Sequence, residues 1–328
     1  MTDQAVALPA AFLTAVLKLP TNEVSFERIG ADRGFAGTVL RLTIKAHDRK
    51  PLTLVAKVGP DPALDREVTF YRDLATRLSA PAPRCWYAGP APDGTPVLLL
   101  EDLTAARAGD ALTGCSIDDV AAVLASMAPF WRHPATSPVI GTLPSWGGDP
   151  AARQERFRVS WASLREQLSG ELPPEIWLLG ERLCESLGMV AAGLRNAPSG
   201  VVHGDLHLDN ILFMPDSAAA QPAVLDWGTV RLGPSVIDVF PFLAMSLSPE
   251  DHVRHAADLL ADLAISSSAL DDGRRGLLCY FAGLIGWRSR PPGQNQRERA
   301  LRAAALGDGR LVSALLQWDA ASVLESPA

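Results

Sequence analysis

Three polar side chains in the second half of this 328-residue chain have the types and spacing for metal-assisted chemistry. Asp205 and Asn210 lie five positions apart, and Asp226 follows Asn210 by sixteen positions, after the apolar run 223–225. A hairpin turning over residues 215–222 would place Asn210 and Asp226 side by side. Their amide and carboxylate oxygens are the hard ligands that Mg²⁺ takes in proteins. Asp205 would then stand nearby as a carboxylate that can accept a proton.

A lysine and a glutamate in the first third supply complementary charges. Lys57 lies in the β-prone run 52–58, and Glu67 follows ten residues later. Between them, Asp61 and Pro62 are typical of a helix start. Glu67 falls on the apolar face of that helix, where a carboxylate needs a partner. We therefore predict that Glu67 holds Lys57.

The elements that must position these residues divide the chain into a strand-rich first third and a helical remainder. Strands are predicted at 26–29, 38–46, 52–58 and 97–100, and helices at 8–19, from Pro62, from the capping box at Ser116, and at 175–196. Residues 134–150 are rich in Pro, Gly and Ser and predict a long loop. This order indicates an α+β fold with a small β-rich lobe at 1–102 and a larger helical lobe at 103–328.

The motifs resemble a known family. The run 203–210, His-Gly-Asp-Leu-His-Leu-Asp-Asn, resembles the catalytic-loop signature H-G-D-x-H-x-x-N of the aminoglycoside phosphotransferase and choline-kinase-like family, relatives of protein kinases. The run 225–228, Leu-Asp-Trp-Gly, resembles that family's metal-binding segment, and 66–71 is similar to its ecdysteroid-kinase-like branch. The resemblance spans residues 25–245 and implies a two-lobed protein-kinase-like fold. Because H-R-D, D-F-G and A-P-E are missing from the sequence, protein substrates are disfavoured.

The resemblance also implies roles for the residues that carry it. Asp205 would orient and deprotonate an acceptor hydroxyl, while Asn210 and Asp226 would bind Mg²⁺. Lys57, fixed by Glu67, would hold the α- and β-phosphates of ATP or GTP.

Supporting residues are implied in the same way. His203 would shape the catalytic loop, and Asp238 would brace it from below. Gly34, in the loop 30–37, would cover the phosphates, although this loop departs from G-x-G-x-x-G. Glu101 to Leu103 would form the hinge that meets the nucleobase through backbone groups.

Several residues receive no firm role from the motifs. Asp209 stands where the family often has a small or apolar residue, and Arg231 fits either a phosphate contact or the surface. Four tryptophans lie in the segment 131–177, called the insert below, and fit either stacking on a sugar or base or core packing: Trp131, Trp146, Trp161 and Trp177.

The implied reaction is Mg²⁺-dependent transfer of the nucleotide γ-phosphate to a hydroxyl of a small molecule. An antibiotic is the first expectation, either an aminoglycoside or another sugar or nucleoside antibiotic, which would give resistance. A primary metabolite such as choline or a sugar is the second. A polycationic aminoglycoside needs an acidic pocket, and the carboxylates offered for it are Glu250, Asp251, Asp258, Asp262, Asp271 and Asp272. Because Arg254, Arg274 and Arg275 dilute them, a neutral or acidic acceptor fits the Trp- and Arg-rich insert better.

Two other classes stay open. The alternation of His203, Asp205, His207 and Asp209 is compatible with a metal-dependent hydrolase, with the remaining histidines scattered and His252 expected on a helix surface. A non-catalytic kinase-like binding module is the other alternative, although such modules usually lose the base or a metal ligand.

Composition limits the partners and the compartment. The formal net charge of −7 argues against nucleic acid and anionic membranes, which select basic surfaces. No run of eighteen uncharged apolar residues predicts a membrane span, and the N-terminal segment does not resemble a signal peptide. The four cysteines form no C-x-x-C pair, which favours reduced thiols and a cytoplasmic location. The expected assembly is a monomer or a homodimer.

Overall fold

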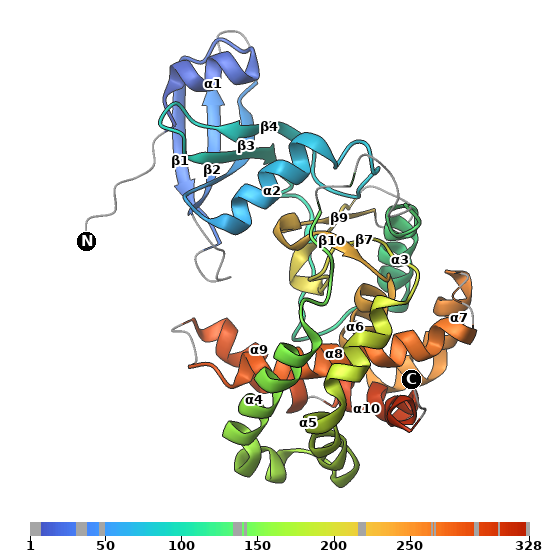
Figure 1. Cartoon of the computed structure of the whole chain (residues 1–328). Helices are drawn as coiled ribbons and strands as arrows, with labels where there is room; N and C mark the ends of the chain where they lie inside the picture. The colour runs from blue at the N-terminus through green and yellow to red at the C-terminus, as the bar shows by residue number, and fades with distance from the viewer. Residues whose placement is uncertain are drawn as a thin grey trace.

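The computed structural model describes residues 8–30, 38–45, 50–133, 140, 143–215, 221–263, 265, 267–291, 295–307 and 309–325. A sheet lobe at one end stands on a larger helical lobe (Figure 1). The predicted two-lobed α+β architecture is confirmed. Within the described ranges, none of the helices combines the length and the apolar character needed to cross a bilayer.

The sheet lobe is one antiparallel sheet of five strands in the order β1-β2-β3-β5-β4. Its elements are α1 (Ala10–Leu17), β1 (Glu23–Arg28), β2 (Thr38–Lys45), β3 (Leu52–Val58), α2 (Pro62–Asp73), β4 (Cys85–Pro90) and β5 (Pro96–Glu101). Strand alternation gives the sheet two faces. Leu42, Leu54 and Leu99 pack in one cluster with α1, whereas Leu98 and Leu100 belong to the core that includes α2. The side chain of Lys57 therefore projects from the face of the sheet that packs against α2.

Helix α2 begins as the sequence predicts. Asp61 caps it, because its Oδ1 accepts a hydrogen bond from the Ala63 backbone N–H at 2.7 Å, and Pro62 occupies the first turn. Leu64, Val68 and Tyr71 bury the inner face. Glu67 shares that face with only 2% of its surface exposed, so the helix delivers a carboxylate into the interior.

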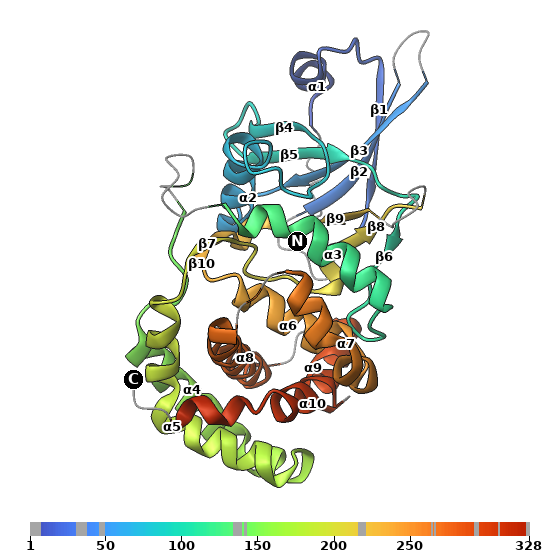
Figure 2. The ribbon, with the colours of Figure 1, turned by 90° about the vertical axis from the view of Figure 1, so that its right-hand side faces the viewer.

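Short strands lie between the sheet lobe and the helices of the larger lobe (Figure 2). These helices are α3 (Ile117–Trp131), α4 (Pro150–Glu171), α5 (Pro174–Arg195), α6 (Val236–Ser246), α7 (Pro249–Asp262), α8 (Ser267–Arg288), α9 (Gln296–Gly307), α10 (Arg310–Gln317) and the 3₁₀ turn η4 (Ala320–Leu324). The predicted cap of α3 is present, since the Ser116 hydroxyl accepts from the Asp119 backbone N–H at 3.2 Å.

The short strands carry the motif residues of the sequence. They are β6 (Arg107–Ala108), β7 (Gly200–Val202), β8 (Ile211–Phe213), β9 (Pro222–Val224) and β10 (Arg231–Gly233), with 3₁₀ turns η2 (Leu208–Asn210) and η3 (Trp227–Thr229). They pair as β6-β8-β9 and as β10-β7. The predicted hairpin across residues 215–222 is thus β8 with β9.

The two lobes meet where α2 contacts η3. Trp227 is fully buried and stacks on Phe70, with ring centroids 4.4 Å apart and an interplanar angle of 7°. Arg66 Nε donates to the Gly228 carbonyl at 2.8 Å. Aromatic stacking and a charge-assisted hydrogen bond therefore join the helix that carries Glu67 to the turn that follows Asp226.

Two features differ from the sequence prediction, β4 and the burial of His252, and one predicted loop is described only in part. β4 was not predicted, because Gly89 and Pro90 end it and its residues show no apolar–polar alternation. The loop before α4 lies partly outside the described residues. His252 is not on a helix surface: it is 1% exposed, because Gln317 and Trp318 from α10 and its end pack against it.

Candidate active site

The loop after β7 is held by one buried carboxylate. Asp238, on α6, accepts hydrogen bonds from the backbone N–H groups of His203 at 2.7 Å and Gly204 at 2.9 Å, and from Trp131 Nε1 at 2.9 Å. Burial raises the pKa of Asp238, while His203 and these three donors oppose the rise. Gly204 has a φ of 83°, and a Cβ there would lie 2.7 Å from the Thr229 carbonyl oxygen. Only glycine fits this close turn.

His203 links the loop to the segment that carries Asp226. Its ring is fully buried and lies edge-on to Trp227. Nε2 lies 2.9 Å from the Leu225 carbonyl oxygen, and Nδ1 accepts from the Asp205 backbone N–H at 3.2 Å. A ring with its proton on Nε2 satisfies both bonds, so His203 shapes the backbone on either side of the cleft.

Asp205 presents its carboxylate at the surface of a cleft. Its side chain is 51% exposed, and Oδ2 lies 3.7 Å from His207 Nε2. Desolvation beside the pocket raises the pKa of Asp205, but the nearby imidazole of His207, with His203 and Arg231, brings it below its usual range. The group is therefore ionised at neutral pH and able to accept a hydrogen bond from a hydroxyl.

The β8–β9 hairpin brings Asn210 and Asp226 together. The Leu225 backbone N–H donates to the Asn210 carbonyl oxygen at 2.8 Å. Asn210 Nδ2 donates to the Asp205 carbonyl oxygen at 3.1 Å and lies 3.1 Å from His207 Nε2. Asp226 has a φ of 63°, a left-handed conformation that is uncommon outside glycine and concentrates at functional sites.

The oxygen donors of this hairpin fit Mg²⁺ shared with a nucleotide. With its amide nitrogen bonded to Asp205, Asn210 keeps Oδ1 as an acceptor, and the Asp226 side chain is 39% exposed. No group of three His, Cys, Asp or Glu side chains that could hold a metal alone occurs in the described part of the chain. One amide and one carboxylate match the way in which Mg²⁺ is usually held, by few protein ligands plus substrate phosphates.

Lys57 and Glu67 form a close ion pair on the sheet-lobe side. Nζ of Lys57 lies 2.8 Å from both carboxylate oxygens of Glu67 and 3.7 Å from Asp226 Oδ1. The Glu67 carboxylate also accepts from the Trp227 backbone N–H. Burial lowers the pKa of Lys57, but Glu67 and Asp226 outweigh it and raise the pKa overall. A fixed ammonium therefore stands beside the Asn210–Asp226 hairpin.

The other residues predicted to bind nucleotide are Gly34 and the hinge at Glu101 to Leu103. Gly34 lies outside the described residues. Glu101 ends β5, where its backbone N–H donates to the Arg84 carbonyl at 2.9 Å and its side chain accepts from the Arg84 N–H at 2.6 Å. The Leu103 carbonyl accepts from Ala106 N–H at 2.9 Å, closing a turn. The hinge assignment stays a prediction.

Three contacts around the site escaped the sequence analysis. Asp209 accepts from the Ala111 N–H at 2.8 Å and from Arg297 of α9 at 2.7 and 3.0 Å, and Arg297 also binds Asp110 at 2.7 Å. Desolvation raises the pKa of Asp209, but Arg297 and the Ala111 N–H bring it below its usual range. No local pattern indicates a contact between residues 88 positions apart.

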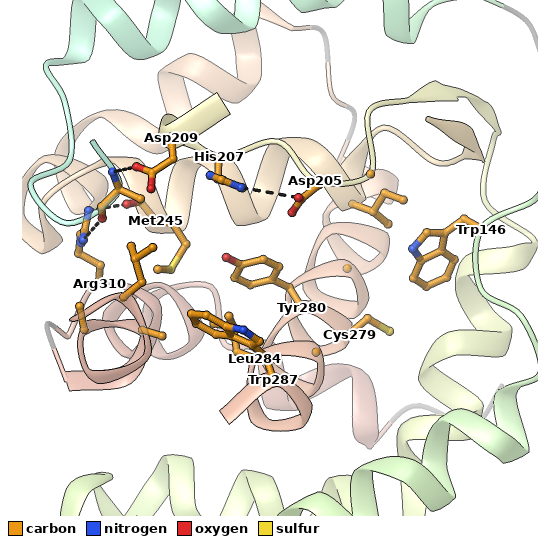
Figure 3. Close-up of a pocket in the computed structure, with 18 of the residues that line it drawn as sticks. Trp146, Asp205, His207, Asp209, Met245, Cys279, Tyr280, Leu284, Trp287 and Arg310 are labelled. Atoms are coloured by element: carbon orange, nitrogen blue, oxygen red, sulfur yellow. Dashed lines mark hydrogen bonds and ion pairs between the residues drawn. The ribbon is translucent and has the colours of Figure 1, made fainter. Parts of the chain in front are cut away.

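A pocket of about 540 Å³ opens beside Asp205 (Figure 3). Tyr280, Leu284 and Trp287 from α8 lie across from Asp205 and His207, and Trp146 closes another side. Its other walls come from α6, α9 and the start of α10, and the remaining lining residues are Ala111, Arg153, Gly204, Asp209, Ile237, Met245, Gly276, Cys279, Gly283, Leu301, Ala304, Ala305 and Arg310.

The four tryptophans of the insert occupy different environments in the structure. Trp146 lines the pocket, and Trp131 donates to Asp238. Trp161 and Trp177 pack against each other between α4 and α5, with centroids 5.1 Å apart. Core packing therefore accounts for the last two.

A sheet lysine paired with a glutamate of α2, next to the loop after β7 and an Asn–Asp hairpin, is the arrangement expected of a protein-kinase-like phosphotransferase. Residues 29–277 match the phosphotransferase enzyme family, and the chain belongs to it. No curated protein was found to match the chain. The family places the chain among small-molecule kinases.

Solved structures show the same fold. An aminoglycoside phosphotransferase from Alicyclobacillus acidocaldarius has a TM-score of 0.57 at 17% identity, covering 97% of this chain and 98% of that one. A choline/ethanolamine kinase family protein from Mesorhizobium loti gives 0.56 at 14%, covering 96% and 98%. A spectinomycin phosphotransferase in complex with ADP and spectinomycin gives 0.55 at 11%, covering 94% and 97%.

Proposed function

We propose that this protein transfers the γ-phosphate of ATP or GTP, with Mg²⁺, to a hydroxyl of a small molecule. One observation carries the proposal: Lys57 Nζ lies 2.8 Å from Glu67 and 3.7 Å from Asp226, so a cation suited to phosphates stands beside the Asn210–Asp226 hairpin, and Asn210 is bonded to the Asp205 carbonyl. The acceptor expected first is an antibiotic, either an aminoglycoside or another sugar or nucleoside antibiotic. Its phosphorylation would give resistance. A primary metabolite such as choline or a sugar is the second candidate.

The residues divide the work of phosphoryl transfer. Lys57, held rigid by Glu67, binds the α- and β-phosphates, and Asn210 and Asp226 hold the metal. When bound, Mg²⁺ neutralises phosphate charge. Asp205 accepts a hydrogen bond from the acceptor hydroxyl and takes its proton as the new O–P bond forms and the bond to the nucleotide breaks. Positioning and charge neutralisation suffice, because this reaction needs little covalent chemistry from the protein.

The hydrolase alternative has little support in the geometry. His203 is buried with both ring nitrogens bonded, and Asp209 is bonded to Arg297 and Ala111. His203 does not line the pocket of Asp205 and His207, and Asp209, which does, is held by Arg297. The non-catalytic module differs from the kinase only in turnover, so the experiment below decides between them.

The test is a nucleotide-consumption assay with ATP and GTP, with and without Mg²⁺, against hydroxylated antibiotics and metabolites. Asp205→Ala is expected to abolish turnover while nucleotide binding persists. Asp226→Ala is expected to abolish Mg²⁺-dependent nucleotide binding. Asp271→Ala, which removes an exposed carboxylate of α8, is the matched control. Unchanged turnover in Asp205→Ala would refute its role, and metal-dependent binding retained in Asp226→Ala would place the metal elsewhere.

The proposal includes an organisation for the whole chain. Residues 1–102 form the nucleotide-binding lobe and residues 103–328 the acceptor lobe, a division supported by β5 ending at Glu101 and by β6 pairing with β8. The protein acts as a monomer or homodimer in the cytoplasm, the compartment that supplies ATP and suits its four free cysteines. We propose no nucleic-acid or membrane partner.

A further inference from the structure

The pocket beside Asp205 has walls that suit an apolar molecule. Trp146, Tyr280 and Trp287 offer aromatic faces, and Met245 and Leu284 add flexible and branched apolar surface. Cys279 belongs to the same wall, and burial raises its pKa to about 12, so it remains a neutral thiol. Aromatic faces and apolar side chains bind ring systems through area burial and stacking.

Among the residues that the structure describes, the pocket lining carries no surplus of negative charge. Two carboxylates belong to this described lining, Asp205 and Asp209. Asp205 is assigned to the acceptor hydroxyl, and Asp209 is already bonded to Arg297 and to the Ala111 N–H. Two guanidinium groups, those of Arg153 and Arg310, line the same space. A buried ammonium without a carboxylate is strongly disfavoured, so a molecule with several amino groups finds no set of partners here.

The carboxylates expected to make the pocket acidic lie elsewhere. None of the six on α7 and at the start of α8 lines it. Within this set, Glu250 pairs with Arg254, Asp271 with Arg274, and Asp272 with Arg275. The aminoglycoside expectation therefore loses the feature on which it depended.

Arg153 adds a positive group that meets no carboxylate among the described residues. Its guanidinium lies 4.8 Å from the centre of the Trp146 ring, and Nη2 donates to the Gly147 carbonyl at 3.2 Å. Its Nε is buried and lacks a hydrogen-bond partner in the described part of the chain. A ligand oxygen or a single anionic group would satisfy this side of the pocket.

We infer that the acceptor is a hydroxyl-bearing molecule with an apolar ring or chain body, uncharged or singly anionic, and not a polycation. This inference rests on the proposed function, because it takes Asp205 as the residue that meets the reacting hydroxyl. It narrows the acceptor class to apolar alcohols and glycosides.

A matched charge series tests the inference. The probes are β-glycosides of 4-methylumbelliferone, 2-naphthol and n-octanol, each made on glucose (neutral), glucuronic acid (anionic) and glucosamine (cationic), with hygromycin B and kanamycin as polycations. Titration calorimetry without nucleotide measures binding to the pocket alone. We expect at least one neutral or anionic glycoside to bind about tenfold tighter than its amine counterpart, and no measurable binding of either polycation.

Variants then locate the binding. Trp287→Ala should weaken the tightest probe about tenfold, while Trp177→Phe, which alters a tryptophan outside the pocket, should not change it. Leu284→Glu adds a carboxylate to the wall and should reverse the order of the neutral and amine glycosides. Arg153→Ala should remove any preference for the anionic sugar over the neutral one. If a variant fails to fold, the other three and the charge series still decide.

Three results would overturn the inference: tighter binding of a polycation than of every neutral and anionic glycoside, tightest binding of the amine in each set, or no binding by any neutral or anionic member. Mg²⁺-dependent nucleotide binding is measured in the same samples. If the parent protein shows no Mg²⁺-dependent nucleotide binding, the proposed function is refuted. If it binds nucleotide in this way and phosphorylates a polycation, only the inference about the acceptor class is refuted.

Discussion

The buried carboxylate of Asp238 makes a quantitative prediction about the catalytic loop. With 1% of its surface exposed, it accepts from two backbone N–H groups and from the indole of Trp131. Asp238→Ala would remove all three acceptor contacts at once. Trp131→Phe removes one donor and leaves both backbone contacts.

The size of each effect follows from these contacts. A buried donor left unsatisfied costs about 1–3 kcal/mol, so three donors give an upper range of roughly 3–9 kcal/mol. Asp238→Ala also removes the cost of burying a carboxylate, and the loop can relax toward water. We therefore expect a loss of about 3–5 kcal/mol in the free energy of unfolding. Trp131→Phe should lose about 1–2 kcal/mol.

The functional effect follows from the position of Asp205, two residues after His203. Without the Asp238 brace, the loop no longer holds Asp205 at the position that the proposed function requires, and a shift of 1 Å in a reacting group costs about a hundredfold in rate. Asp238→Ala should lower kcat by about that factor at a temperature where it is folded. Trp131→Phe should lower it less.

Urea unfolding followed by circular dichroism gives the stability, and initial rates give kcat. Asp271→Ala serves as the surface control and should lie within about 0.5 kcal/mol of the parent protein. The reasoning fails if Asp238→Ala is as stable as this control, because the three hydrogen bonds would then contribute no net free energy. It fails equally if Trp131→Phe is more damaging than Asp238→Ala.

Three further predictions concern other parts of the structure. Glu67→Gln should raise the nucleotide KM about tenfold, since it removes the charge that holds Lys57; an unchanged KM in steady-state kinetics would contradict this. Arg297→Gln should raise the acceptor KM and leave the nucleotide KM unchanged, because Arg297 ties the α9 wall of the pocket to Asp209; a rise in both would refute the separation. Burial lowers the pKa of His252, despite its bond to Gln317. The unfolded chain therefore binds this proton first as pH falls below about 6.5, and the drop in Tm between pH 7.5 and 5.5 should shrink in His252→Gln.

The parts of the fold that sequence predicts are those with local causes. Asp61 and Pro62 start α2, Ser116 starts α3, and the β8–β9 hairpin follows from two apolar runs around a turn. Glu67 stood out because a carboxylate on an apolar face must have a partner. Lys57 is that partner in the structure.

The features that escaped prediction depend on contacts between distant segments. Arg297 reaches Asp209 across 88 positions, and nothing in the pattern of α9 singles it out among neighbouring arginines. His252 becomes buried only because the end of α10 covers α7. The sequence offers the acidic residues of α7 and α8 as an acidic lining only by their region of the chain, and none of them lines the pocket.

The two halves of the site differ in how strongly chemistry constrains their residues. Binding a triphosphate with a metal requires a cation, a carboxylate and oxygen donors at fixed spacing, so the residues proposed for it, Lys57, Asp226 and Asn210, leave a readable pattern. An apolar acceptor wall requires only area and shape, which many combinations of ordinary side chains supply. Tyr280 and Trp287 are therefore indistinguishable in sequence from core residues. The consequence is that reaction class can be argued from motifs in this fold, while acceptor class must be argued from the charges that line the pocket.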